Sequence, residues 1–249
     1  MGDDSIAAGS QPPLRLRVFI SSPADVEEER GIARAVLRRL EKEPQFEGRI
    51  ELDEVSYDDP DAPASMDAHL TFQSAITQSK PKPSACDVVV VILWSRLGSE
   101  IRDPTYRKPG GRGHFTGTEW EFADGVRAAE QGSDTRVWVF RRRKAFPPSR
   151  PDDSKQRIND KQRQENKIRA FFKTSVKSYW WYAPPPKVVP DDFSAAHQDP
   201  QFDFLLGNHL RNLIWDRLQA TGKAQPANPD EGEVKLWEVP PAGERPGED

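Results

Sequence analysis

The sequence contains a single cysteine, Cys86, among its 249 residues. One cysteine cannot form an internal disulfide, and its scarcity fits a reducing cytosol. The longest apolar run, 88–94, is far shorter than the roughly 20 residues that a membrane-spanning helix needs. The N-terminal residues also lack the basic and then apolar segments of a secretory signal. The sequence therefore predicts a soluble, cytoplasmic protein that does not bind a membrane.

Several motifs of common enzyme classes are also missing. No Gly-x-Gly-x-x-Gly follows the first predicted strand, which argues against a Rossmann dinucleotide site. A phosphate-binding loop with Gly-Lys-Ser/Thr and a Gly-x-Ser-x-Gly nucleophile elbow are absent as well. The four histidines, His69, His114, His197 and His209, have no metal-ligand spacing with one another or with Cys86. We therefore expect no metal site and no bound cofactor, so that any catalysis depends on carboxylates, hydroxyls and backbone dipoles.

The composition is lean in apolar residues and rich in charge. Hydrophobic residues make up 35% and charged residues 31%, with a net charge of −4, which does not favour nucleic-acid binding. The apolar residues concentrate between positions 14 and 220, which predicts one packed domain over that range. Residues 1–13 are small and polar, and 221–249 are rich in Pro, Gly and Glu. They are expected to form a disordered leader and a disordered tail or linker.

Strand-like and helix-like segments alternate along the domain. The strand-like segments are 16–22, 50–57, 87–94, 136–140 and 178–182. The helix-like segments are 22–43, 65–79, 118–131, 153–173 and 192–220. Alternation of this kind predicts an α/β fold in which helices cover both faces of a five-stranded, mainly parallel sheet. The order of the strands cannot be read from the sequence, and a flavodoxin-like sheet is the economical choice.

Polar and aromatic residues follow the predicted strands directly. Ligands of open α/β sheets bind at the carboxyl ends of the strands. Ser21 and Ser22 follow the first strand, Tyr57 ends the second and Trp94 ends the third. The segment 116–121 leads into the next helix, whose N-terminus would add N–H donors for a phosphate-bearing ligand. We expect these residues to converge on one crevice.

Glu121 has two interpretations on local grounds. Thr118 and Glu121 are three residues apart, as in a capping box in which Thr118 is the N-cap and Glu121 bonds back to its backbone. That interpretation explains the glutamate by helix stability alone and is favoured locally. The other interpretation is a functional carboxylate in the crevice.

Two further segments also have alternative interpretations. The glycine- and proline-rich segment 95–114 is long for a loop inside a compact domain, which predicts either a lid over a substrate or an assembly surface. The basic run 141–144 is either a solvated strand end or a patch for phosphate or nucleic acid. The solvated strand end is favoured, because no aromatic residue interleaves with the run and acidic residues follow soon after.

Three short motifs together resemble a known family. The first is 16–22 with Asp25, Glu29 and Arg30; the second is 87–94 followed by Arg96-Leu97-Gly98; the third is Gly117-Thr118-Glu119-Trp120-Glu121-Phe122 with Ala123. In their order and spacing they resemble the TIR-like domain at the N-terminus of many bacterial STAND-type signalling ATPases. The resemblance covers about residues 14–219. The third motif is also similar to a segment of nucleoside deoxyribosyltransferases.

The resemblance implies a TIR-like, three-layer relative of the flavodoxin-like fold. Catalytic TIR domains cleave the nicotinamide–ribose bond of NAD with the help of a glutamate, which here would be Glu121. Ser21 and Ser22 would line the ribose or nicotinamide pocket, and Trp94 would stack on a ring. Thr118 and Tyr57 would complete the substrate-binding set. Many TIR domains have a Trp-Cys pair before the glutamate, whereas this chain has Thr-Glu-Trp at 118–120.

Three functions remain open at this point. The first is an NAD+ nucleosidase (NAD glycohydrolase) with NAD as substrate, activated by homo-oligomerisation in antiphage defence, with a C-terminal or separate ATPase or sensor module as partner. The second is a non-catalytic TIR-like oligomerisation module. The third is a nucleoside deoxyribosyltransferase-like N-glycosidase.

Overall fold

The computed structural model describes residues 12–57, 72–111, 113–144, 146–184 and 200–222. Within them the strands are β1 (Leu14–Ser21), β2 (Ile50–Val55), β3 (Val88–Leu93), β4 (Arg136–Arg142) and β5 (Trp180–Tyr182). The α-helices are α1 (Glu27–Glu41), α2 (Phe72–Ser79), α3 (Gly117–Glu130), α4 (Lys155–Thr174) and α5 (Phe202–Ala220). The predicted leader and tail lie almost wholly outside the described residues.

The five strands form one sheet in the order β2-β1-β3-β4-β5, and all four pairings are parallel. This is the flavodoxin-like topology, so the predicted fold class is confirmed. In the pairing of β1 with β3, Ser21 lies opposite Val91. Paired residues of parallel strands point to the same face of a sheet, so this register fixes which side chains share a face.

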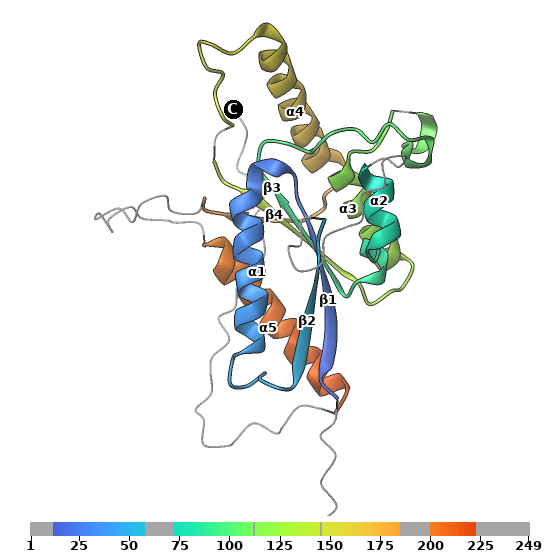
Figure 1. Ribbon diagram of the computed structural model, residues 1–249, viewed down its shortest axis with the longest axis vertical. Coiled ribbons are helices and arrows are strands. Elements are labelled where there is room, and N and C mark those ends of the chain that lie inside the picture. The colour runs from blue at the N-terminus through green and yellow to red at the C-terminus, as the bar shows by residue number, and fades with distance from the viewer. Residues whose placement is uncertain (1–11, 58–71, 112, 145, 185–199, 223–249) are drawn as a thin grey trace, which may run out of the picture.

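Helices cover both faces of the sheet (Figure 1), and the buried apolar residues form two clusters, one on each face. Val88, Val90 and Ile92 of β3 pack with residues of α1 and α5. The alternate residues of β3 pack with residues of α3 and α4 on the other face. Every residue of β3 is buried, which explains why this strand is apolar on both faces. Among the described helices, none is long and apolar enough to span a membrane.

Two helices, α1 and α5, begin several residues later than predicted. α1 begins at Glu27, after a 3₁₀ turn at Ala24–Val26, and not at Ser22. The reason is that the Ser22 hydroxyl accepts a hydrogen bond from Arg30 and does not cap the helix. α5 begins at Phe202, and residues 192–199 of the predicted helix lie outside the described residues. The last part of the predicted helix 65–79 is α2, and residues 65–71 lie outside the described residues.

Gly125 lets α3 approach the sheet closely. A Cβ at this position would lie 3.0 Å from Val89 Cγ2 and 3.2 Å from Val137 Cγ2. Because both neighbours are β-branched and packed, Gly125→Ala is expected to push α3 outward and to destabilise the fold by about 1–3 kcal/mol. Urea unfolding of the variant and the wild type checks this. A stabilised variant would contradict it, because relief of the glycine's helix penalty would then outweigh the overlap.

Candidate active site

The sheet reverses its strand order between β1 and β3. From β1 the chain crosses to β2 on one side and then to β3 on the other. Helices leave the carboxyl edge in opposite directions at such a switch point, and ligands of open α/β sheets bind in the crevice there. The residues at this point are Ser21, which ends β1, and the segment that follows β3 at Trp94. Ser21 and Trp94 thus follow the two strands that flank the switch point.

A buried hydrogen bond between a serine and a carboxylate lies at this switch point. Ser21 Oγ donates to Glu121 Oε2 at 2.6 Å. Ser21 is 1% exposed and Glu121 is 6% exposed. A hydrogen bond to an ionised acceptor is short and strong, and it offsets part of the cost of burying the charge. The structure thus brings together two of the predicted residues, one from a strand and one from a helix that are 100 positions apart.

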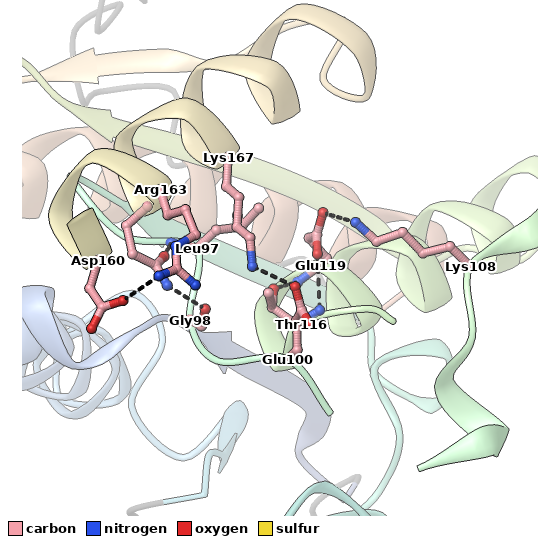
Figure 2. A network of polar contacts seen from close by, with 10 residues as sticks. Leu97, Gly98, Glu100, Lys108, Thr116, Glu119, Asp160, Arg163 and Lys167 are labelled. Carbon is pink, nitrogen blue, oxygen red and sulfur yellow. Dashed lines mark hydrogen bonds and ion pairs between the residues drawn. The ribbon is translucent and has the colours of Figure 1, made fainter. Parts of the chain in front are cut away.

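The capping box of α3 belongs to Thr116 and Glu119, so the predicted box of Thr118 and Glu121 was wrong. Thr116 Oγ1 accepts from the Glu119 N–H at 3.2 Å, and Glu119 Oε2 accepts from the Thr116 N–H at 2.9 Å (Figure 2). Thr116 has the extended backbone that an N-cap needs, because it forms a β-bridge with Glu100. Helix capping therefore does not account for the glutamate at position 121.

Contacts with α4 hold the first part of the segment between β3 and α3 (Figure 2). Gln164 of α4 accepts from the Leu97 N–H at 3.1 Å and donates to the Gly98 carbonyl at 3.0 Å. Further along, Lys167 of α4 pairs with Glu100 at 2.7 Å. This hydrogen bond from Lys167 lowers the pKa of the Glu100 carboxyl from its ordinary value. Because Glu100 bridges to the N-cap of α3, these contacts connect α4 with the start of the helix that carries Glu121.

Lys108 holds the same segment against α3. Its Nζ pairs with Glu119 Oε1 at 2.6 Å, while the other oxygen of Glu119 completes the capping box. One carboxylate therefore fixes both the loop and the helix end. The prediction of a functional loop at 95–114 stays a prediction, since its contacts fit a support for α3 as well as a lid.

Ser22 and Tyr57 meet through a residue that the sequence analysis did not assign to the site. The buried Arg30 donates from Nη1 to Ser22 Oγ at 3.1 Å and to the Pro23 carbonyl at 2.9 Å. Its guanidinium also lies over the Tyr57 ring, 5.4 Å from the centroid. The sequence did contain a signal for this residue, because Arg30 falls among the inward-facing positions of α1 and a buried arginine requires polar partners. Thr118 is buried in the first turn of α3.

Trp94 lies apart from the Ser21–Glu121 pair. It packs with the layer formed by α1 and α5, whereas Glu121 belongs to α3 on the other face. Its indole Nε1 donates to the Lys144 carbonyl at 3.1 Å, and the Arg142 guanidinium lies 4.7 Å from its ring. The expected single crevice is thus divided by the sheet, because alternate residues of a strand point to opposite faces. A ring stacked on Trp94 would not reach Glu121 from the same side.

Thr116→Ala is expected to destabilise the protein by about 1 kcal/mol, because it removes the hydroxyl that caps α3. Thermal or urea unfolding checks this value. Thr118→Ala removes a hydroxyl from the first turn of the same helix, two residues after the cap, and serves as the matched control for the cap itself. A larger loss of helix stability for Thr118→Ala than for Thr116→Ala would contradict the assignment of the N-cap.

Comparison with known proteins adds no family assignment. No protein-family model matches the chain, and no curated protein has a significantly similar sequence. The class of protein is therefore defined by its architecture, a flavodoxin-like α/β domain with an all-parallel sheet. At the switch point of that sheet it carries a buried serine–carboxylate pair.

Proposed function

We propose that the chain is a TIR-like NAD glycohydrolase with Glu121 as its catalytic carboxylate. The observation that carries the proposal is the buried hydrogen bond between Ser21 and Glu121 at the switch point of the sheet. A carboxylate that is withdrawn from water and not needed to cap its helix requires another explanation, and function is the most direct one. The resemblance of the motifs around both residues to TIR-like domains gives the reaction class.

The chemistry needs one well-placed carboxylate. The bond between the ribose C1′ and the nicotinamide nitrogen breaks, and its electron pair neutralises the positive charge of the pyridinium. Because nicotinamide leaves as a neutral molecule, no general acid is required. The ribose acquires oxocarbenium character, which Glu121 would stabilise electrostatically or capture covalently before water completes the hydrolysis. Ser21 would orient the carboxylate as a positioning residue.

The regulation that we propose is activation by assembly. A domain of this class would be dormant as a monomer and active when a carrier ATPase or sensor module brings copies together, in a cellular defence response. The test is nicotinamide release from NAD by the purified chain, alone and fused to an oligomerising module. Release by the assembled wild type supports the proposal. An assembled wild type that binds NAD but releases no nicotinamide overturns it, and release of a free base from deoxynucleosides in place of NAD points to the deoxyribosyltransferase-like alternative.

A further inference from the structure

A cavity of about 590 Å³ lies beside the carboxyl ends of β4 and β5. It is lined by the segment that follows β4, by α4 and by Trp94 and Trp181. Neither Ser21 nor Glu121 lines it. Its volume is within the range of small-molecule sites, roughly 300–1,000 Å³. This cavity is thus separate from the candidate active site and is large enough for a ligand of its own.

Positive charge dominates the walls of this cavity. Six of its fifteen described lining residues are Lys or Arg, and one, Glu165, is acidic. The six are Arg141, Arg142, Arg143, Lys144, Lys161 and Arg169. The whole chain has a net charge of −4, so this concentration is a local departure from the average. Like charges gathered around one hollow repel each other, and a bound anion would relieve that repulsion.

The acidic residues nearby compensate only part of this charge. Three of the six cations pair with carboxylates: Arg142 with Glu29, Lys161 with Asp153, and Arg169 with Glu165. For Arg141 and Lys144 the described part of the chain holds no carboxylate partner. Arg141 instead donates to the Tyr179 hydroxyl at 3.3 Å. The cavity therefore retains cations whose charge no described acid balances.

Aromatic rings hold these cations in position. The Arg141 guanidinium lies 4.5 Å from the Trp181 ring centroid and 4.2 Å from that of Phe172. Lys144 Nζ lies 5.6 Å from the Trp94 ring. A guanidinium on an aromatic face keeps its planar edge of N–H donors available to a phosphate. Indole rings and stacked guanidinium planes also accept heteroaromatic bases, which is how many proteins hold nucleotides without reading their sequence.

We propose that this cavity binds a nucleotide, with its phosphates on Arg141 and Lys144 and its base against the indole rings. The ligand class follows from the combination of unbalanced cations, aromatic planes and a hollow of sufficient volume. It favours the phosphate-binding interpretation of 141–144 over the solvated strand end, because aromatic residues that are absent around that run in the sequence, Trp94, Phe172 and Trp181, come close to it in space. The proposal does not rest on NAD cleavage, since neither Ser21 nor Glu121 lines this cavity.

The experiment is a calorimetric titration of the full chain with ATP, repeated at higher salt. We expect saturable binding that weakens as salt is added. The double variant Arg143→Glu, Lys144→Glu should weaken it by roughly ten-fold or more. Both side chains are exposed, so charge reversal there spares the core. The thermal unfolding of the variant confirms that it is folded.

The matched control is the double variant Lys82→Glu, Arg136→Glu. It makes the same change in net charge at two exposed residues near the amino ends of β3 and β4, at the opposite edge of the sheet. ATP affinity should stay within about two-fold of the wild type. An equal loss in both double variants overturns the proposal, as does inorganic triphosphate binding as tightly as ATP. Binding of a single-stranded oligonucleotide without binding of ATP at about 1 mM overturns it too.

Discussion

Glu121→Gln is expected to lower nicotinamide release from NAD by roughly 10³-fold, with little change in stability. A glutamine at position 121 has nearly the same volume and can still accept the hydrogen bond from Ser21, so the packing of α3 is retained. It lacks the negative charge that would stabilise or capture the oxocarbenium ion. Chromatographic measurement of nicotinamide from equal amounts of assembled wild type and variant, together with urea unfolding of both, checks the expectation.

Glu119→Gln is the matched control for that experiment. It removes a negative charge two residues away, from the carboxylate that serves the capping box and pairs with Lys108. A glutamine there can still accept from the Thr116 N–H, so nicotinamide release should change by no more than a few-fold. If both variants lose activity alike, the position of α3 matters and the Glu121 charge does not. Unchanged assembly and signalling by Glu121→Gln, with no NAD turnover in the wild type, would identify a non-catalytic interaction module.

Arg142→Met is expected to destabilise the protein by roughly 3–5 kcal/mol. Arg142 Nε donates to Glu29 Oε1 at 2.6 Å, and Arg142 Nη2 forms an ion pair with the same oxygen. Glu29 is 0% exposed, and its other oxygen has no hydrogen-bond partner among the described residues. Methionine fills much of the volume of the arginine stem but leaves a carboxylate buried without its cation. Chemical unfolding gives the free energy directly.

The Tyr182 hydroxyl cannot compensate for this loss. It donates to Glu29 Oε1 at 3.0 Å. Burial raises the pKa of Tyr182 well above its ordinary value, and the charge of Glu29 adds to the shift, so the hydroxyl remains a neutral donor over the working pH range. Glu29→Gln should destabilise less than Arg142→Met, because an amide oxygen still accepts from Arg142, whose guanidinium is 9% exposed and lies over the Trp94 ring, whereas Arg142→Met strands a carboxylate that is 0% exposed. The reverse ranking, or a loss under about 1 kcal/mol for Arg142→Met, would contradict the account.

The elements of the fold follow from local patterns in the sequence. The run 88–94 contains the central strand β3, since apolar residues on both faces fit only a strand covered on both sides. The polar helix predicted at 153–173 is α4, displaced by two residues at its start and one at its end. Such patterns are local consequences of burial and backbone geometry. Strand order depends on contacts between distant segments, so the flavodoxin-like sheet was predicted only as the most economical topology.

The errors at the site have a shared cause, which is that local patterns do not determine tertiary contacts. Thr116 and Thr118 are both good N-caps, and the antiparallel bridge to Glu100 selects Thr116 by giving it an extended backbone. In the same way, a strand that is apolar on both faces does not show which face the tryptophan after it will join. Val91 points to the same face as its partner Ser21. Trp94 is three residues beyond Val91 and therefore points to the opposite face.

The sequence by itself determined the α/β class, the approximate position of each described strand and the candidate role of Glu121, because hydrophobic periodicity and motif spacing are properties of neighbouring residues. Only the tertiary structure decided that Glu121 bonds Ser21 and does not cap its helix, and that Trp94 lines a separate, cationic cavity. The physical reason is that side-chain partners are selected by strand register and by loops that bring residues from distant positions together. Those contacts depend on the whole fold and leave no pattern in the neighbouring residues.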